Sequence, residues 1–182
     1  MNKSTELNLW MNLRNPDEIY SKRIIIKKNE YLLAEGMMDC HIYIVEDGAF
    51  KVYYISDYQE QIVRFGYPDS IIISPESFFD GKQSKFYIQA LKNSVMLRIH
   101  RDDFYDYIKQ DISYLLQYIQ TLEATMSQLI AREIDLLTVS PVERYNRVYR
   151  RSPQLFQHIP AKYIASYLRM TPETLSRIRA QK

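Results

Sequence analysis

The stretch at residues 159–182, IPAKYIASYLRMTPETLSRIRAQK, decides how the end of the chain folds. Its pattern predicts two short helices joined by a tight turn. Thr171-Pro172 is a helix-start signal, because threonine caps free N–H groups and proline lacks the N–H that would stay unpaired at the first helical position. Counted from Ala161, the fifth position is Ala165, which is small enough to let a second helix cross closely.

Apolar residues on both sides of the turn predict one shared core. Leu175 and Ile178 are spaced as i and i+3, so they face back toward Ile164 and Leu168. This is the layout of a helix-turn-helix, whose second helix enters the major groove of DNA by its N-terminal end. Many helical hairpins share this spacing, and Arg169 stands at the turn position where a left-handed backbone favours glycine.

The outward residues of the second helix suit contacts with DNA. Arg177 can donate two parallel hydrogen bonds to guanine O6 and N7. Glu173, one turn earlier, can accept from cytosine N4 or hold Arg177 in position. Free N–H groups at the helix start, with Lys162 and Thr174, can contact phosphate. The predicted DNA-binding residues are Lys162, Thr171, Pro172, Glu173, Thr174, Ser176, Arg177 and Arg179.

The charge is divided unevenly along the 182 residues. From Ser140 to Lys182 there are 9 basic and 2 acidic residues, a net charge of +7, whereas the first 139 residues carry −5. Ser140-Pro141, with Glu143 in the capping-box position, predicts that a new helical module starts at this point. The split indicates a small polyanion-binding module on an acidic body, and a solvated basic helix surface is the alternative that charge leaves open.

Residues 112–137 repeat apolar side chains in alternating steps of three and four, which is the spacing of a heptad seam. Glu133 is the one polar interruption. A helix packed on its own domain is one interpretation, and the pattern favours the other, a parallel pair of helices joining two subunits. A wider stripe with Leu116, Ile130 and Leu137 predicts that the helix faces both its own body and a partner. The predicted dimer seam is Ile112, Leu115, Ile119, Leu122, Met126, Leu129 and Leu136.

The segment from Tyr31 to Ile99 has the pattern of short strands separated by turns, and the chain's 16 Tyr and 7 Phe favour aromatic packing between strands. Asp47-Gly48 predicts a two-residue hairpin. Only 4 glycines serve the turns, so asparagine and aspartate must form other corners. The strand spacing predicts an all-β sandwich or barrel, and the chain as a whole an α+β protein.

The composition excludes several kinds of site. Cys40 is the single cysteine, which rules out an internal disulfide and a cysteine-based zinc or iron–sulfur site within one chain. The presence of only one cysteine favours a protein of a reducing compartment. We expect Cys40 to be a small buried hydrophobic residue. An uncharged span of about 18 apolar residues is absent, so we expect a cytoplasmic protein without membrane contact.

Taken together, these segments resemble the Crp/Fnr family of bacterial transcription regulators over nearly the whole chain. The similarity is most specific in PAKYIASYLRMTPETLSRIR, where Glu173 and Arg177 sit at the positions with which the family reads bases. EGMMDCHIYIVEDGAFKVYY resembles the family's early strands, and SVMLRIHRDDF its last strand leading into the long helix.

The resemblance implies a double-stranded β-helix (jelly-roll) sensor at residues 1–110, a dimerisation helix at 111–139 and a helix-turn-helix domain at 140–182. It implies a homodimer on a pseudo-palindromic double-stranded DNA site, with RNA polymerase as a possible further partner. This chain resembles a subset of the family whose members end just past the recognition helix, without a β-hairpin wing.

The chain departs from the family's cyclic-nucleotide motif. The Gly-Glu pair that binds ribose falls on Ile73-Ser74, and the Arg-Ser pair that binds the cyclic phosphate falls on Lys85-Phe86. Lysine lacks the bidentate fork of arginine, and the carboxylate and hydroxyl are both missing, so we expect no response to cyclic nucleotides. This degenerate pocket either holds another small effector or is filled by side chains. No metal or cofactor is expected.

An enzyme and a scaffold are the competing interpretations. Metal-dependent enzymes with a similar β-fold gather several histidines and a carboxylate, but the β-rich segment has only His41 and His100, which also suit structural positions better than haem ligation. Familiar catalytic motifs are absent, so we expect no catalysis. Arg169 favours a Crp-like dimeric scaffold or ligand-binding protein that has lost sequence-specific DNA binding. Glu173 and Arg177 favour a regulator.

Overall fold

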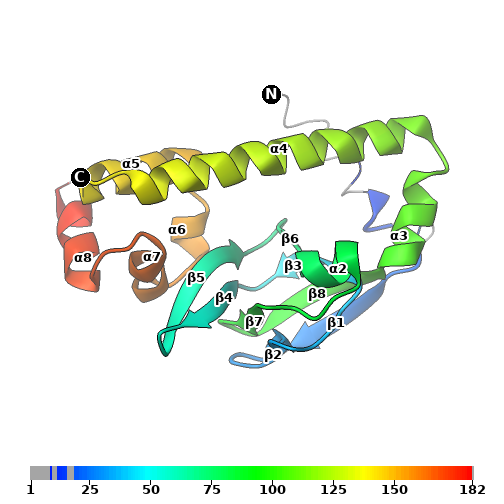
Figure 1. The fold of residues 1–182 in the computed structure, drawn as a ribbon, viewed down its shortest axis with the longest axis horizontal. Helices are drawn as coiled ribbons and strands as arrows, with labels where there is room; N and C mark the ends of the chain where they lie inside the picture. Colours follow the sequence, from blue (N-terminus) through cyan, green and yellow to red (C-terminus); the bar gives the residue numbers. More distant parts are fainter. Residues whose placement is uncertain (1–8, 10–11, 16–18, 182) are drawn as a thin grey trace.

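Two antiparallel four-stranded sheets face each other in the β-domain of the computed structural model, which describes residues 9, 12–15 and 19–181 (Figure 1). The predicted jelly roll is thereby confirmed, while residues 1–8, 10–11 and 16–18 of the predicted first domain and residue 182 of the predicted last domain lie outside the described residues. One sheet has the strand order β1 (Lys22–Ile26), β8 (Ser94–His100), β3 (His41–Asp47), β6 (Ile71–Ile72), and the other β2 (Tyr31–Leu33), β7 (Tyr87–Ala90), β4 (Phe50–Ser56), β5 (Gln59–Gly66).

The predicted hairpin at Asp47-Gly48 is wrong, because β3 and β4 belong to different sheets. Strand β3 pairs with β6 and β8, and β4 pairs with β5 and β7. Gly48 has φ +126°, and a Cβ there would lie 2.1 Å from Ser94 Oγ, so this corner between the sheets requires glycine. The hairpin that does form joins β4 to β5 through Asp57 and Tyr58, with φ of 51° and 60°.

Corners without glycine occur as the composition predicts. Asn29, Asp57 and Asp69 all have positive φ, a conformation that short polar side chains tolerate better than most. The space between the sheets is filled by apolar side chains that include Phe50, Ile88 and Met96, all of them buried.

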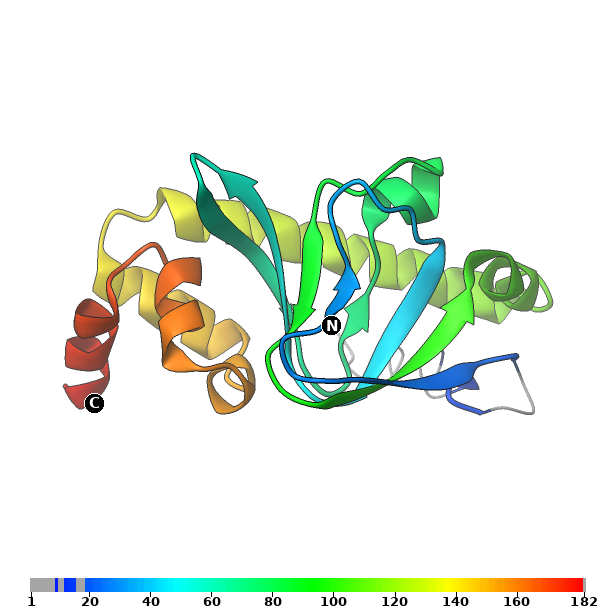
Figure 2. The same cartoon turned by 90° about the horizontal axis from the view of Figure 1, so that it is seen from below.

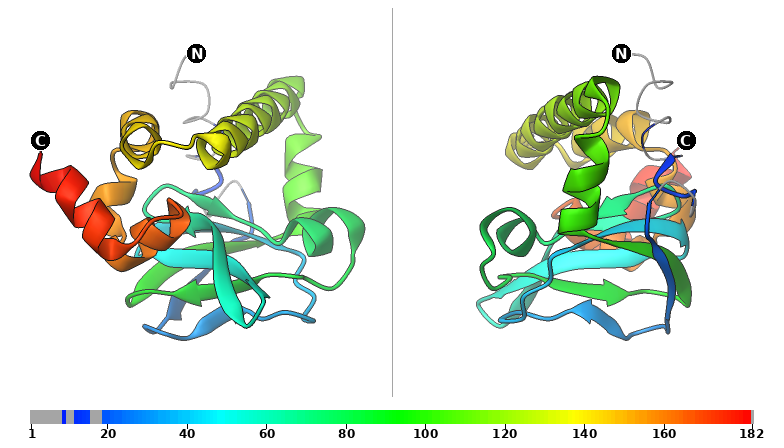
Figure 3. Two further views of the ribbon diagram at one scale, coloured as in Figure 1. Left: turned by 60° about the vertical axis from the view of Figure 1, so that its left-hand side comes forward. Right: turned by 90° about the vertical axis from the view of Figure 1, so that its right-hand side faces the viewer.

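Two short helices close the β-domain. Helix α2 (Pro75–Asp80) follows β6, and α3 (Arg101–Ile108) follows β8. Phe78 of α2 and Phe104 of α3 are buried in one cluster with their rings 6.2 Å apart. Figure 3 shows α3 running from the sheets up to the start of the long helix.

Helix α4 (Ile112–Leu137) has the predicted extent and lies along the molecule above the sheets (Figure 1). It begins after Asp111, whose carboxylate accepts a hydrogen bond from Ser113 N at 2.7 Å. The helix does face the chain's own body, but the wider stripe of Leu116, Ile130 and Leu137 does not contribute to that contact, because all three are exposed. The inward face of α4 instead carries aromatic, small and polar side chains: Tyr114, Tyr118, Thr121, Ala124, Arg132 and Asp135.

Four helices follow α4 in the described residues: α5 (Pro141–Arg151), α6 (Leu155–His158), α7 (Ala161–Tyr167) and α8 (Pro172–Ala180). Both predicted caps are confirmed, since Ser140 Oγ accepts from Glu143 N at 3.3 Å and Thr171 Oγ1 from Thr174 N at 3.2 Å. Figure 2 shows these helices beside the β4–β5 hairpin.

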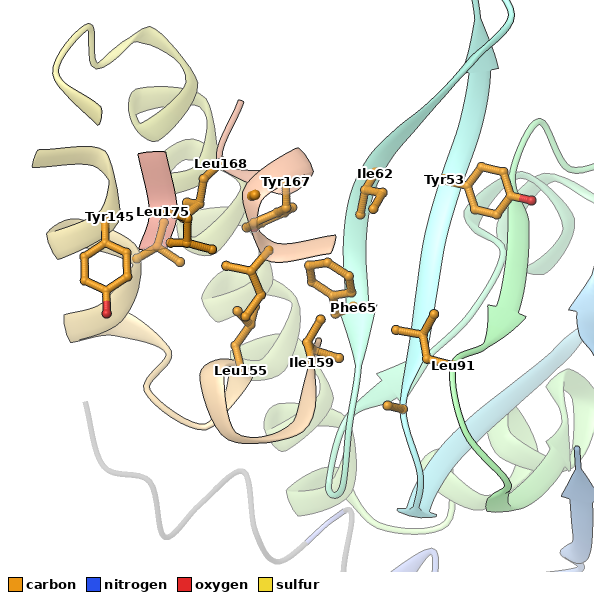
Figure 4. Packing of buried hydrophobic residues seen from close by; sticks show 14 of the residues in the cluster. Tyr53, Ile62, Phe65, Leu91, Tyr145, Leu155, Ile159, Tyr167, Leu168 and Leu175 are labelled. Atoms are coloured by element: carbon orange, nitrogen blue, oxygen red, sulfur yellow. The ribbon is translucent and has the colours of Figure 1, made fainter. Parts of the chain in front are cut away.

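The C-terminal helices and the β-domain share one apolar cluster, in which Ile62 and Phe65 of β5 lie on the side of the strand that faces the helices (Figure 4). The β-domain contributes Ala49, Tyr53, Ile62, Phe65 and Leu91, and the helices contribute Tyr145, Val148, Leu155, Ile159, Ile164, Ala165, Tyr167, Leu168, Leu175 and Ile178. The domain boundaries at residues 110 and 139 therefore stay a prediction. Among the described residues, no helix is both long and apolar enough to cross a membrane.

Candidate nucleic-acid interface and ligand pocket

Helices α7 and α8 form the packed pair that the sequence predicts. Ala165 and Ile164 are fully buried, and Leu175 and Ile178 meet them from α8. Arg169 takes the left-handed turn conformation with φ +54°. Its backbone N–H donates to Ser166 O at 3.0 Å, so arginine forms the turn that usually takes glycine.

The outward face of α8 is open to solvent at its N-terminal end. Pro172, Glu173, Ser176 and Arg177 are exposed there, opposite the buried face of the helix. The pKa of the Glu173 carboxyl lies below its usual value, because it accepts hydrogen bonds from its own backbone N–H and from Thr171, and because Arg177 is near. The surface therefore offers an anion and a cation one helical turn apart.

The other predicted DNA-binding residues lie differently. Thr171 and Thr174 are joined in the helix cap, and Thr174 is half-buried. Arg179 is half-buried with its guanidinium carbon 5.6 Å from the centre of the Phe156 ring, so it packs toward α6. Lys162 is exposed at the start of α7. A DNA-binding role for all eight residues stays a prediction.

Several of the basic residues in the segment 140–182 form ion pairs and hydrogen bonds within the chain. Asp135 on α4 is fully buried and binds Arg147 Nε at 3.0 Å as well as the guanidinium of Arg151. Arg144 is buried and donates to the carbonyl oxygens of Thr138 and Arg169. The charge count divided the chain at Ser140, so it assigned Asp135 to the acidic segment and Arg147 and Arg151 to the basic segment. An acidic residue on the inward face of the heptad helix was the signal that sequence reasoning missed.

The predicted dimer seam lies on the outward face of α4, with exposed Glu133 between Leu129 and Leu136. Each of its seven apolar residues is at least 36% exposed in this single chain. Ile134 is also exposed, so the apolar strip is broad. Its role in dimerisation stays a prediction.

A cavity of about 530 Å³ opens at the free end of the β4–β5 hairpin. It is lined by Glu35, Tyr54, Ile55, Val63, Lys85 and Phe86. The rings of Tyr54 and Phe86 meet edge to face with centres 6.3 Å apart. The hydroxyl of Tyr87 donates to Glu35 Oε2 at 3.1 Å.

The structure brings only two of the four predicted pocket residues together. Lys85 and Phe86 line the cavity, but Ile73 and Ser74 do not. Ser74 is 3% exposed at the start of α2, and Ile73 packs against the cluster around Phe78. A shared ligand-binding role of the four residues stays a prediction. Sequence reasoning also missed the lining residues of the β4–β5 hairpin, Tyr54, Ile55 and Val63. No local sequence pattern shows which strands lie beside residues 85–86.

The two histidines of the β-domain form a hydrogen-bonded surface cluster. His41 Nδ1 lies 2.6 Å from Asp39 Oδ1, and the His41 and His100 rings are 5.2 Å apart. Tyr43 also donates to Asp39, at 2.6 Å, and burial together with this bond raises the pKa of Tyr43. Half-buried Cys40 donates to Ser77 O at 3.6 Å. Within the described part of the chain, no group of three or more His, Cys, Asp or Glu side chains is placed to hold a metal ion.

Comparisons with known proteins agree with this architecture. Residues 23–111 match the cyclic nucleotide-binding domain family. FixK2 from Bradyrhizobium japonicum is 18% identical over 90% of this chain and 84% of its own, with a TM-score of 0.73. A mutant of CooA from Carboxydothermus hydrogenoformans is 15% identical over 91% and 76%, with a TM-score of 0.68.

Two further matches differ in how much of each protein they cover. Thermus thermophilus Catabolite Activator Protein is 18% identical, covering 100% of this chain and 83% of its own, with a TM-score of 0.56. Patatin-like phospholipase domain-containing protein 6 of Pongo abelii is 23% identical over 149 residues, which are 80% of this chain. The match spans only 11% of that relative's length.

Proposed function

We propose that the chain is a homodimeric, DNA-binding regulator of transcription without catalytic activity, because residues 23–111 match the cyclic nucleotide-binding domain family and the chain has a fold similar to that of the Crp/Fnr regulators. The observation that carries the proposal is the outward face of α8, where Glu173 and Arg177 are exposed while Leu175 and Ile178 anchor the helix.

In this proposal the N-terminal end of α8 enters the major groove. Arg177 donates two hydrogen bonds to a guanine, and Glu173 accepts from a cytosine or orients Arg177. Pro172 and Ser176 lie beside them on the exposed face. Lys162 at the start of α7 contacts phosphate, which adds affinity without sequence information.

The test is selection of bound duplexes from a random pool, followed by fluorescence anisotropy at several salt concentrations. We expect the wild type to select an inverted repeat and to lose affinity steeply as salt rises, because phosphate contacts release counterions. Arg177→Ala should lose about 1–3 kcal/mol of discrimination at one base pair of each half-site.

Arg150→Ala is the matched control, because Arg150 is an exposed arginine of the same helices outside α7 and α8. It should keep the wild-type sequence preference. Equal, weak and sequence-independent binding by wild type and Arg177→Ala would contradict the proposal. That outcome would favour a Crp-like scaffold that has lost sequence-specific DNA binding.

Dimerisation through the outward face of α4 is the second part of the proposal. A strip of apolar side chains this long on a monomer marks an interaction surface, and its heptad spacing suits a second copy of the same helix. Leu122→Lys in the middle of the seam should give monomers in sedimentation equilibrium, because it would bury two like charges. Gln128→Lys, on the exposed polar side of α4, should leave the dimer intact.

The third part is that cyclic nucleotides are not the effector. Lys85 and Phe86 line the cavity, the hydroxyl of Ser84 is buried and bonded to the backbone of Phe86, and Ser74 is buried at the N-cap of α2. A buried cyclic phosphate and ribose would leave most of their hydrogen bonds unmade. Isothermal titration with cAMP and with cGMP should give no binding at millimolar concentration, and saturable binding of either would contradict this part.

A further inference from the structure

A smaller cavity lies on the outer face of the pair of strands β1 and β8. Its volume is about 170 Å³, and the described residues that line it are Arg14, Ser21, Arg23 and Leu97. Arg23 and Leu97 lie directly opposite each other on the two strands. Leu97 packs in the cluster around Phe104 and not in the cluster between the sheets, so this cavity lies outside the β-sandwich.

The size of this cavity limits what it can hold. A molecule of liquid water takes about 30 Å³, so the space corresponds to roughly six water molecules. Pockets for drug-sized ligands are larger, roughly 300–1,000 Å³. A tetrahedral oxyanion such as phosphate or sulfate therefore fits this space, whereas a whole nucleotide does not.

The lining presents positive charge and hydrogen-bond donors. Within the part of the chain that the structure describes, it contains two guanidinium groups, one hydroxyl group and one aliphatic side chain, but no carboxylate. Arg14 Nε is buried and has no hydrogen-bond partner. A buried donor without an acceptor is unfavourable, so an oxyanion beside Arg14 would satisfy an unpaired group.

Two carboxylates hold the guanidinium groups from outside the lining. Arg14 Nη2 donates to Asp69 Oδ1 at 2.7 Å. Arg23 donates to both carboxylate oxygens of Glu46, through Nε at 2.7 Å and Nη2 at 2.8 Å. A guanidinium group has five N–H donors, so both arginines keep donors for a ligand after these pairs have formed.

The two arginines are also close to each other before any ligand binds. The pKa of the Glu46 carboxyl lies below its usual value, because Arg23 donates to it and because the charges of Arg23 and Arg14 are near. Leu13, next to Arg14, is fully buried in the same cluster as Leu97, so packing fixes the position of Arg14 over the sheet. Groups that are already ordered bind a ligand with less loss of entropy.

We propose that Arg14, Ser21 and Arg23 form a binding site for a small tetrahedral oxyanion, a phosphate or sulfate group. The anion accepts hydrogen bonds from Arg14 Nε, from Arg23 and from the Ser21 hydroxyl, beside the apolar surface of Leu97. The site is independent of the proposed function, because residues of the β-domain alone form it.

Isothermal titration of the full chain with inorganic phosphate tests the site. We expect saturable binding of one anion per chain at millimolar or lower concentration. Arg14→Met and Arg23→Met should each weaken binding about tenfold, because each removes a charged donor. Both side chains are partly exposed, so the variants should fold, which circular dichroism checks.

Lys22→Met is the matched control. Lys22 is an exposed cation of the same strand as Arg23, but successive residues of a strand point to opposite faces of the sheet. This variant should bind phosphate as the wild type does. Equal affinity of the wild type, Arg14→Met and Arg23→Met would overturn the site, as would no saturable binding to the wild type at millimolar phosphate.

Nuclear magnetic resonance locates the bound anion. The Nε–Hε signal of Arg14, assigned by its absence from Arg14→Met, should shift during the titration together with the backbone signals of Ser21 and Arg23. Shifts confined to residues 140–182 would overturn the site, because they would place phosphate on the basic helices.

Competition defines the shape of the ligand. Sulfate, which has the same tetrahedral shape, should displace phosphate, and planar acetate with its single charge should bind more weakly than either. Failure of sulfate to compete, or acetate binding as tightly as phosphate, would overturn the assignment to tetrahedral oxyanions. Because no readout uses DNA, failure of this site is distinct from failure of the DNA-binding proposal.

Discussion

The C-terminal helices are held at two places, and the two contacts differ in chemistry. At the end of α4, fully buried Asp135 binds Arg147 and Arg151; we call this the charged junction. On β5, Phe65 meets Tyr167 with ring centres 5.2 Å apart, and neighbouring Tyr67 stacks on His158 at 5.8 Å; we call this the aromatic junction.

The difference indicates which contact can open. Separating the charged junction would leave a buried carboxylate without partners, which is costly, so α4 and the helices after it should move as one body. The aromatic junction consists of apolar faces with an exposed polar contact, Arg169 to Gln61, at its edge. Opening it would expose apolar surface at a cost that grows with the exposed area, but it would leave no buried charge without a partner, so this is the junction that is better suited to open.

Tyr167 links the aromatic junction to α4. Its ring contacts Phe65 of β5 and also Arg132 of α4, whose guanidinium carbon is 3.5 Å from the ring centre. Arg132 also donates to Tyr167 O at 2.6 Å. A shift of α7 on β5 therefore reaches α4 through one side chain.

Breaking the charged junction should have the largest effect. Asp135→Ala should lower the free energy of unfolding by about 3–5 kcal/mol, because it leaves two partly buried guanidinium groups without their carboxylate. The measurement is urea unfolding followed by circular dichroism. Asp106→Ala is the control, since Asp106 is exposed and pairs with Lys109 at 3.5 Å, and it should cost less than about 1 kcal/mol. Equal losses in the two variants would contradict the importance of burial.

Weakening the aromatic junction should cost less. A double-mutant cycle of Phe65→Leu and Tyr167→Leu should give a coupling energy of about 0.5–1.5 kcal/mol, the usual contribution of an aromatic pair beyond its buried area. Urea unfolding of the four proteins gives this value. The cycle removes the separate contribution of Arg132 to Tyr167. A coupling energy of zero would mean that the two rings are neighbours without mutual stabilisation.

The C-terminal helices were the most predictable part of the molecule because their signals are local. Ser140 and Thr171 cap the helices that the sequence assigns to them, and Ala165 and Leu175 meet in the predicted core. The extent of α4 also follows from a regular apolar period. These features depend on residues a few positions apart, so one sequence contains the information needed.

The errors concern contacts between distant segments. A glycine corner such as Gly48 fits a hairpin and a passage between sheets equally well, and the choice depends on where β8 lies. The pairing of Asp135 depends on α5 folding back along α4. The cavity combines the hairpin with residues 35 and 85–86, so the motif positions Ile73 and Ser74 gave no information about its walls.

The smallest effect should separate the two roles of Arg169 at the edge of the aromatic junction. Its φ of +54° strains any residue with a Cβ, while its guanidinium holds Gln61. Arg169→Ala and Arg169→Gly both lose the contact, but only glycine relieves the strain. Relief of about 1–2 kcal/mol, less the flexibility that glycine adds to the unfolded chain, should make Arg169→Gly about 0.5–1 kcal/mol more stable than Arg169→Ala. Urea unfolding of the two variants measures the difference. Equal stability would mean that the turn relaxes in the alanine variant, and the Gln61 contact would then be what holds residue 169 in its left-handed conformation.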